Sequence, residues 1–214
     1  MNELWQNIFF IGSGIKLTLR LLCGGLGLGV IAGTFIAILR YKKIASVLTN
    51  PFISIMRGTP LILQLSIIYF AVPSLIGVKP SIMVAGIITF GLNSAAYIAE
   101  ILRAGIESLP KGQFEAAATL HISTFYLWKD IILPQVIKNI FPALVSEVIA
   151  LLKETALIST IGGMDLMRKS QSIAAEQFTY FLPLCIAGCY YYLFVLIIEY
   201  CGKKIEKGDY FVNY

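Results

Sequence analysis

The chain has 214 residues, of which 57% are hydrophobic and only 14% are charged, and its mean hydropathy is +0.80. A soluble domain usually carries about 25% charged residues. A chain with so little charge cannot cover its surface with groups that water solvates, which argues against an ordinary soluble domain and favours a lipid bilayer as the solvent. The formal net charge of +5 does not indicate nucleic-acid binding, because in a membrane chain basic residues mark one side of the bilayer.

Apolar stretches long enough to cross a bilayer, which takes about 17–25 residues, recur along the chain. Four of them are free of charged residues and span 21–39, 58–78, 81–99 and 178–198. A further stretch, at about 133–155, contains Lys138, Glu147, Lys153 and Glu154 and is the least regular. We therefore predict an all-α fold, a polytopic membrane helix bundle of about five transmembrane helices that forms a single domain over residues 1–214.

The distribution of basic residues predicts the orientation of the bundle, because cytoplasmic loops of membrane proteins are enriched in Lys and Arg. Nine lie after the first span, between the third and fourth, or after the fifth: Arg40, Lys42, Lys43, Arg103, Lys111, Lys129, Lys203, Lys204 and Lys207. The loops on the other side carry Lys79, Arg168 and Lys169. This pattern predicts a cytoplasmic C-terminus and an N-terminus outside. Lys16 and Arg20 run against it, and we expect their side chains to reach the outer interface.

The first span carries glycines at a regular interval. Gly25, Gly29 and Gly33 are four residues apart and share one stripe of a helix. A stripe of small residues lets another helix approach closely, so we predict a packing face, either within the subunit or at a seam between two subunits. Pro60, Pro73 and Pro142 lie inside or beside spans and predict kinks or unwound turns there.

The connection between the third and fourth spans, residues 104–134, is too amphipathic to be a simple linker. Pro110 suits the first turn of a short helix, where its missing N–H is not needed. Glu115 then falls early in that helix, where a negative charge complements the macrodipole. The alanines that follow give high helix propensity and a small face that fits a groove of another protein. Ser123 suits the N-cap of a second segment, so we predict two short helices on the cytoplasmic surface.

Residues 115–134 resemble the cytoplasmic signature of the membrane subunits of ABC importers. The likeness lies in the opening Glu115-Ala116-Ala117 and in the close, Ile131, Leu133 and Pro134. Other segments resemble polar amino-acid permeases of the glutamine and histidine type: Arg57-Gly58-Thr59-Pro60, Asn93-Ser94-Ala95-Ala96-Tyr97 with Glu100, Arg103-Ala104-Gly105, Leu152-Lys153-Glu154, and Glu199 with Gly208-Asp209. Together these segments cover nearly the whole chain.

The resemblance implies the fold of the type I ABC-importer permeases. It implies a permease subunit that forms the path of a polar amino acid, glutamine or a related neutral or basic one, across the bacterial inner membrane. The implied partners are cytoplasmic ATP-binding subunits, an extracytoplasmic solute-binding protein and a second permease subunit, expected to be another copy of this chain. The sequence lacks a Gly-x4-Gly-Lys-Ser/Thr phosphate loop, so ATP hydrolysis is expected on a partner. We expect no cofactor, no metal and no nucleic acid.

The resemblance assigns contact with the ATP-binding subunit to seven residues: Glu115, Ala116, Ala117, His121, Ile131, Leu133 and Pro134. One of them departs from the family pattern, which has glycine where this chain has His121, its single histidine. We expect a turn with positive φ there, which His adopts more readily than most residues, at the cost of some strain. A metal-binding or catalytic role for His121 is disfavoured, because no Cys, Asp or Glu cluster accompanies it.

Five polar residues inside the spans are candidates for contact with an amino-acid solute: Asn93, Ser94, Tyr97, Glu147 and Glu154. A carboxylate near the bilayer centre costs about 2.5–3.5 kcal/mol, so it usually faces a cavity or a partner. At a rise of about 1.5 Å per residue, Asn93 and Glu147 lie at similar depths. We expect the two glutamates to bind the ammonium group and the other three residues to orient the rest of the solute.

A structural interpretation of the same residues stays open. Glu147 and Asn93 are then packing groups, bonded to each other or to backbone, and Glu154 forms an interfacial ion pair with Lys153. Arg57 is expected to be a positive-inside anchor, with a gate or coupling contact as the alternative.

Three other classes of membrane protein fit the sequence less well. The spans contain no His/Asp/Glu or Ser/His constellation, which argues against a membrane enzyme. A self-contained secondary carrier usually shows paired repeats with broken helices in corresponding positions, which five dissimilar spans do not. The third alternative is a structural membrane subunit.

Overall fold

The computed structural model describes residues 2–42 and 46–208, and the regular elements of this part of the chain are all helices. The all-α prediction is therefore confirmed. Lys43, which contributed to the charge pattern, and Asp209, which contributed to the resemblance, lie outside the described residues.

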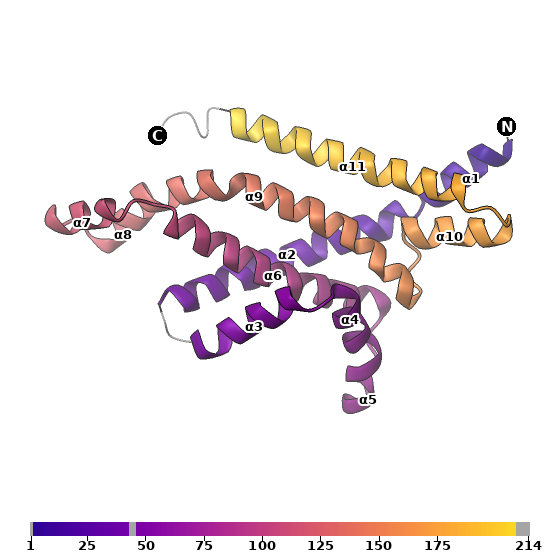
Figure 1. Cartoon of the computed structure of the whole chain (residues 1–214), viewed down its shortest axis with the longest axis horizontal. Helices are drawn as coiled ribbons and strands as arrows, with labels where there is room; N and C mark the ends of the chain where they lie inside the picture. Colours follow the sequence, from indigo (N-terminus) through magenta and orange to yellow (C-terminus); the bar gives the residue numbers. More distant parts are fainter. Residues whose placement is uncertain (1, 43–45, 209–214) are drawn as a thin grey trace.

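Four long helices run roughly along one axis of the molecule (Figure 1): α2 (Ile15–Tyr41), α6 (Ile82–Glu107), α9 (Leu133–Glu154) and α11 (Phe181–Lys207). α1 (Asn2–Gly12) continues α2 beyond the bundle. α8 (Thr124–Tyr126), η2 (Leu127–Ile132) and η3 (Thr155–Ile161) join α9 in one apolar helical run. All four helices are long and apolar enough to cross a membrane. The predicted first, third, fourth and fifth spans are thus confirmed as helices, the fourth despite its charges.

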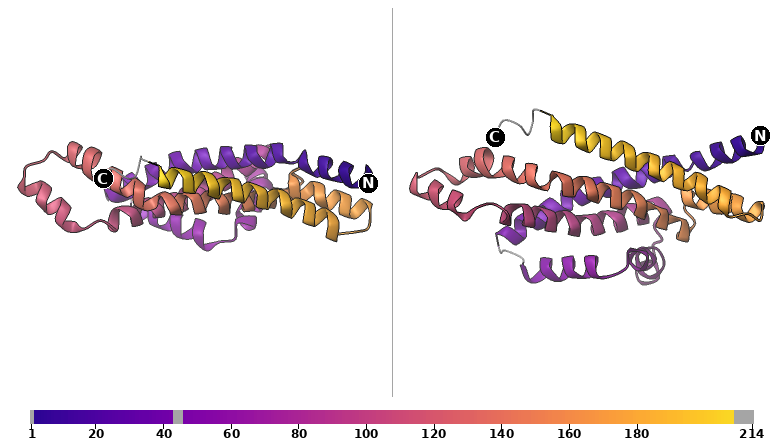
Figure 2. Two further views of the ribbon diagram at one scale, coloured as in Figure 1. Left: turned by 90° about the horizontal axis from the view of Figure 1, so that it is seen from above. Right: turned by 45° about the horizontal axis from the view of Figure 1, so that its top comes forward.

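The second predicted span, 58–78, is not one straight helix. α3 (Ser46–Gly58) meets the run of α4 (Leu61–Ser66), η1 (Ile67–Ala71) and α5 (Val72–Ile76) at a bend of 106°. Pro60 is extended, with ψ of 133°, and its ring disfavours a helical Thr59, so α3 ends before it. In the right-hand view of Figure 2 the run from α4 to α5 is seen nearly end-on while α3 lies along the bundle. We call the turn at residues 58–60 the elbow; the bent pair brings the spans to five at most.

Two π-helical segments, in which the helix is wider than an α-helix, precede prolines. The π-helical segments η1 and η2 each end two residues before a proline, Pro73 and Pro134 respectively. A proline inside a helix lacks the N–H for the preceding turn, and its ring clashes with the carbonyl four residues earlier. A locally widened turn relieves that clash, so the helical run continues past both prolines. Pro134 therefore shapes the helix that leads into α9.

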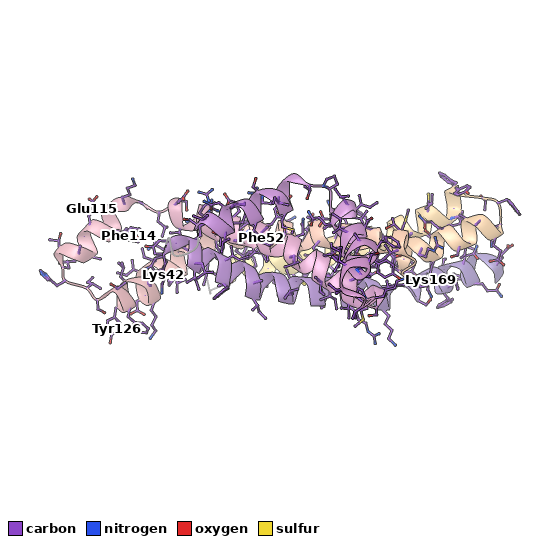
Figure 3. The ribbon with its side chains drawn as sticks, turned by 90° about the horizontal axis from the view of Figure 1, so that it is seen from below. Lys42, Phe52, Phe114, Glu115, Tyr126 and Lys169 are labelled. Atoms are coloured by element: carbon purple, nitrogen blue, oxygen red, sulfur yellow. The ribbon has the colours of Figure 1, made fainter. Side chains whose placement is uncertain are left out.

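The bundle has two distinct ends. α7 (Lys111–Thr119) and α8 lie at one of them, which we call the loop end; the start of α1 and α10 (Leu166–Glu176) lie at the other, the α10 end (Figure 1). In Figure 3 Glu115 and Tyr126 mark the loop end and Lys169 marks the α10 end. α11 runs from the α10 end back toward the loop end, so the last helix and α7 reach the same side of the bundle.

Buried polar contacts hold the α10 end together. Asp165 is fully buried and accepts hydrogen bonds from the backbone N–H of Arg168 at 2.9 Å and from the hydroxyl of Tyr191 at 3.0 Å. Its burial raises the pKa of the Asp165 carboxyl, although both hydrogen bonds act in the opposite direction. The amides of Asn7 and Gln177 exchange hydrogen bonds of 3.2 Å in both directions. α10 is thereby joined to α1 and to α11.

The glycine stripe of α2 packs against α6 within the subunit. A Cβ atom added at Gly29 would lie 2.8 Å from the Cβ of Ser94, and one at Gly33 would lie 2.8 Å from the carbonyl oxygen of Ala95. Gly25 meets the side chain of Phe90 in the same way, at 3.0 Å. Of the two predicted uses of this stripe, the structure therefore has the one within the subunit. The close approach brings the backbones of α2 and α6 together along most of their length.

We predict that Gly33→Ala destabilises the protein whereas Gly27→Ala does not. Both substitutions gain the same helix propensity, but a Cβ at Gly27 meets nothing within 4 Å, while the one at Gly33 strikes backbone. Overpacking costs about 1–3 kcal/mol, so the melting temperature of the detergent-solubilised protein should fall for Gly33→Ala and stay level or rise for Gly27→Ala. Equal melting temperatures for the two variants would contradict the packing described here.

Candidate functional site

The predicted site residues fall on two surfaces. One lies along the middle of α6, where α3, α4 and α9 meet it, and carries the candidates for solute contact. The other is the loop end, which carries the candidates for contact with an ATP-binding subunit.

Glu147 of α9 is held by Ser94 of α6. The Ser94 hydroxyl donates a hydrogen bond of 2.8 Å to Oε1 of Glu147. Ser94 is fully buried beneath the glycine stripe, whereas Glu147 is half-buried. Ser94 thus orients the carboxylate of Glu147 and is too deep to contact a solute itself.

Asn93 points away from Glu147, toward the elbow. It is buried, and its amide Nδ2 donates to the carbonyl of Met56 at 3.0 Å and to Oε1 of Gln64 at 3.4 Å. Nε2 of Gln64 donates to the same Met56 carbonyl at 2.9 Å and to the hydroxyl and carbonyl of Thr59 at 2.9 and 3.2 Å. These two amides bind carbonyls that the broken helix leaves without helical partners. Of the two bonds that the structural interpretation offered for Asn93, the one to backbone is therefore formed, whereas none to Glu147 is found within the described residues.

Tyr97 lies one turn from Ser94 on α6 and carries Arg57 on its ring. The guanidinium carbon of Arg57 is 5.1 Å from the ring centroid, within the range of a cation–π contact. Arg57 comes from the last turn of α3, directly before the elbow. It therefore packs on the solute-side candidate Tyr97, which neither interpretation of Arg57 from the sequence included.

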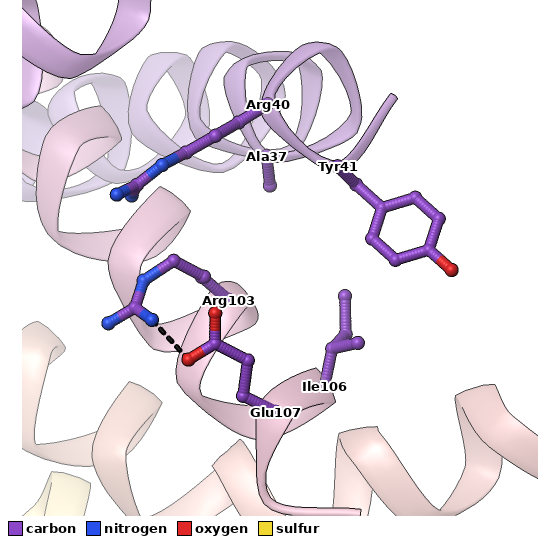
Figure 4. A pocket seen from close by; sticks show the side chains of 6 residues that line it. All are labelled: Ala37, Arg40, Tyr41, Arg103, Ile106 and Glu107. Carbon is purple, nitrogen blue, oxygen red and sulfur yellow. Dashed lines mark hydrogen bonds and ion pairs between the residues drawn. The ribbon is translucent and has the colours of Figure 1, made fainter. Parts of the chain in front are cut away.

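A cluster of charges follows Tyr97 toward the loop end. Glu100 accepts a hydrogen bond of 2.6 Å from Arg40 and one of 2.8 Å from Nε of Arg103, while Arg57 stays at 3.9 Å. Arg103 also pairs with Glu107 (Figure 4). A cavity of about 390 Å³ opens between α2 and α6 and is lined by Ala37, Arg40, Tyr41, Arg103, Ile106 and Glu107. Glu100 was quoted from the sequence only for its resemblance; its role as the centre of this cluster appears only in the fold.

Glu154 stands apart from these groups, near the end of α9. It is half-buried and lines a cavity of about 380 Å³ with Ala150, Lys153 and Leu157. It follows Glu147 by seven residues on the same helix face, roughly 10 Å along the axis. Within the described residues, no ion pair joins Glu154 to Lys153 at salt-bridge distance.

The loop end is a small folded unit. Leu109, Ile132, Val136 and Ile140 form its buried core, and Phe114 and Trp128 pack against it. The amides of Gln113 and Gln135 exchange hydrogen bonds of 2.9 and 3.0 Å, which tie α7 to the start of α9. The loop is also shorter than the predicted 104–134, because α6 reaches Glu107 and the next helical run starts at Thr124.

Both predicted short helices exist, with differences in detail. Pro110 precedes α7 as its N-cap residue, one position earlier than expected. Glu115 lies in the middle of α7, so the predicted benefit from the macrodipole at the helix start is wrong. Ser123 is the N-cap residue of α8, but its side chain makes no capping hydrogen bond. The second helix is not separate, because α8 and η2 continue into α9.

His121 has the predicted positive φ, 54°. The N–H of Ile122 bonds to the carbonyl of Ala117 at 3.0 Å, and the N–H of His121 bonds to the carbonyl of Ala118 at 3.2 Å. This pair of bonds is the Schellman motif, which usually ends a helix with glycine at the left-handed position. The ring nitrogen Nδ1 of His121 lies 3.1 Å from the carbonyl oxygen of Thr119, a contact that glycine would lack.

The other predicted coupling residues differ in exposure. Glu115 and Ala116 are exposed and Ala117 is buried, so α7 presents only part of its small face to the outside. Ile131 and Pro134 are half-buried and Leu133 is exposed. Large apolar side chains outside the seven predicted coupling residues are exposed in the loop end: Leu120, Phe125 and Tyr126. The spacing of these residues in the sequence did not predict their exposure, because exposure depends on how the loop packs in the fold.

The chain is similar to known proteins over most of its length. The model of a family described as "Binding-protein-dependent transport system inner membrane component" matches residues 25–207. The chain is 48% identical over 207 residues to a putative glutamine transport system permease protein of Rickettsia typhi, covering 96% of this chain and 95% of that one. It is 40% identical over 205 residues to the arginine transport system permease protein of Bacillus subtilis, covering 92% and 91%. A crystal structure of an amino acid ABC transporter with histidines superposes with a TM-score of 0.86 at 36% identity, covering 92% and 93%.

We predict that His121→Gly leaves the turn after α7 as stable as before or stabilises it by up to about 1 kcal/mol, because glycine relieves the cost of the left-handed conformation. Ala118→Gly, a matched introduction of glycine at a helical position of the same segment, should instead destabilise α7 by about 1 kcal/mol. Hydrogen exchange of the amides of residues 117–122 measures both. Equal acceleration of exchange in the two variants would contradict the motif.

Proposed function

This chain belongs to the family of binding-protein-dependent transport system inner membrane components, and we propose that it carries glutamine or a related neutral or basic amino acid. It is a membrane-spanning permease subunit of an amino-acid ABC transporter, in which ATP hydrolysis belongs to a separate subunit. The solute is inferred from two relatives, one described as a putative glutamine permease and the other as an arginine permease. Neither of these solutes is acidic.

The half-buried carboxylate of Glu147 is the observation that carries the proposed solute class. A carboxylate on a membrane-spanning helix is costly unless a partner or a polar path compensates it. The single hydrogen bond from Ser94 fixes its direction and leaves an oxygen for a further donor. An ammonium group is that donor in every amino acid, whereas the second carboxylate of an acidic amino acid would be repelled.

The other solute-side residues take different proposed roles. We assign Tyr97 to the wall of the path, beside Glu147, and Glu154 to a second acidic position further along α9. Asn93 and Ser94 act indirectly, the first by holding the elbow and the second by holding Glu147. This division follows from burial, because Asn93 and Ser94 are both enclosed by neighbouring helices.

The loop end is the proposed contact with the ATP-binding subunit. It combines exposed Glu115 and Ala116 with exposed apolar side chains on a rigid base. The loop end then faces the cytoplasm, and the α10 end, with the start of α1, faces outward toward a solute-binding protein. The transporter in this proposal lies in a bacterial inner membrane and contains a second copy of this chain.

We predict that Glu147→Gln weakens transport of the amino acid without impairing assembly. Losing a charged hydrogen bond of about 1.5–3 kcal/mol corresponds to a rise in KM of roughly ten- to a hundredfold. Uptake into liposomes that hold this chain with its ATP-binding subunits, and that are supplied with the solute-binding protein, measures the effect.

Glu199→Gln is the control for this experiment, because it removes a carboxylate of α11 that pairs with Lys203 and lines a separate cavity between α9 and α11, and it should leave KM unchanged. An unchanged KM for Glu147→Gln would return Glu147 to a packing role. Equal uptake by liposomes containing this chain alone would instead favour a secondary carrier.

We also predict that Glu115→Arg reduces recovery of the ATP-binding subunit with the affinity-tagged permease by at least several-fold. Charge reversal on an exposed contact residue replaces attraction by repulsion and leaves the fold intact. Glu176→Arg, the same exposed change at the α10 end, is the matched control and should leave recovery unchanged. Equal recovery for both variants would place the ATP-binding subunit elsewhere.

A further inference from the structure

An amino acid brings a carboxylate as well as an ammonium group, and the carboxylate needs a donor on the protein. The sequence suggested that Asn93, Ser94 and Tyr97 supply it. In the fold, the amide of Asn93 is committed to the elbow and the hydroxyl of Ser94 to Glu147, and both side chains are buried. The donor for the carboxylate must therefore come from another residue near the same turns of α6.

Of the three arginines near these turns, Arg57 has the most exposed side chain and the longest distance to Glu100. Its side chain is 40% exposed, compared with 26% for Arg40 and 35% for Arg103. The two oxygens of Glu100 accept hydrogen bonds from Arg40 and Arg103, whereas Nη1 of Arg57 stays 3.9 Å away. Within the described residues, the hydrogen bonds include none from Arg57. Its guanidinium packs on the ring of Tyr97 and forms a long ion pair with Glu100, with 3.9 Å between Nη1 and Oε1.

The charges of this cluster do not balance. Three guanidiniums, those of Arg40, Arg57 and Arg103, share the carboxylates of Glu100 and Glu107, which leaves one positive charge. We assign this extra positive charge to Arg57, because its guanidinium lies farther from Glu100 than those of Arg40 and Arg103. An uncompensated positive charge beside a membrane path favours an anionic group of the solute.

Arg57 and Glu147 stand beside the same stretch of α6. Ser94, which holds Glu147, and Tyr97, which carries Arg57, are three residues apart and lie on neighbouring turns of one face, roughly 4.5 Å along the axis. Within the described residues, no direct ion pair joins Arg57 to Glu147. The two opposite charges thus lie beside neighbouring turns of α6 without forming an ion pair with each other in the described part of the chain.

We propose that the guanidinium of Arg57 binds the α-carboxylate of the transported amino acid while the carboxylate of Glu147 binds its ammonium group. The inference rests on the proposed function and adds a selection step to it, because the permease itself then requires a free carboxylate. Arginine suits this role, since its planar fork donates two parallel hydrogen bonds to a carboxylate. The elbow amides of Asn93 and Gln64 fix the end of α3 and therefore position Arg57.

The test compares free amino acids with their α-carboxamides, which keep the ammonium group and lose the carboxylate charge. Calorimetric binding of glutamine, arginine and the two carboxamides is measured on the purified complex of this chain with its ATP-binding subunits. The solute-binding protein is left out, because it would impose its own selection. We expect the wild-type complex to bind each free amino acid at least about tenfold more tightly than its carboxamide.

In Arg57→Gln the affinity for the free amino acid should fall by about ten- to a hundredfold while the affinity for the carboxamide changes by less than about threefold. Arg57→Lys keeps the charge without the fork and should retain part of the discrimination. Arg168→Gln, which removes an exposed guanidinium at the α10 end, away from this cluster, is the matched control and should leave the ratio unchanged. Melting temperatures of the complexes identify any variant that fails to fold, in which case Arg57→Lys and the wild-type ratio decide.

The outcomes separate the two proposals. Equal binding of free amino acids and carboxamides by the wild-type complex, or discrimination retained in full by Arg57→Gln, would overturn the role of Arg57 and leave the proposed function standing. A wild-type complex that binds neither glutamine nor arginine would overturn the proposed solute class, and the role of Arg57 with it.

Discussion

The close contact between α2 and α6 is the constraint on which the rest of the structure depends. Glycines at three successive positions of one stripe remove the side chains that would hold the two helices apart. Ser94 is enclosed at this contact, and its hydroxyl reaches across to the carboxylate of Glu147 on α9. Helix association in lipid relies on such packing, because lipid chains are as apolar as the helices themselves. The seam between α2 and α6 thereby sets where an acidic group stands inside a membrane-spanning bundle.

The elbow solves a second problem that the bilayer imposes. A broken helix exposes carbonyls, and each unsatisfied group costs several kcal/mol where water is absent. The amides of Gln64 and Asn93 bind the carbonyls of Met56 and Thr59, so the break is compensated from within the fold. The same contacts fix the last turn of α3 against α6 and so determine where Arg57 lies. The hydrogen bonds that compensate the broken helix therefore also position the side chain of Arg57.

The loop end is connected to both helices that carry the polar residues. α7 follows α6 after three residues, and η2 leads directly into α9. Its apolar core and the paired amides of Gln113 and Gln135 pack it against the ends of these helices. The loop end is thus continuous with the helices that carry Ser94 and Glu147. α6 connects the loop end to Ser94, and the run of η2 and α9 connects it to Glu147.

The sequence by itself determined the helical class and four of the helices, because hydropathy acts over a few neighbouring residues, and its resemblance to the permease family implied the left-handed turn at His121. It predicted a kink at Pro60 but not the size of the bend, 106°. It also did not determine the partner of Asn93, the use of the glycine stripe within the subunit, or the exposure of Leu120, Phe125 and Tyr126. Each of these depends on which helix lies opposite, and side chains 29 to 60 positions apart in the chain, such as Gln64 with Asn93 and Arg40 with Glu100, meet only after folding. Tertiary packing decided them, because in a bilayer a polar group must find its partner on a neighbouring helix instead of in water.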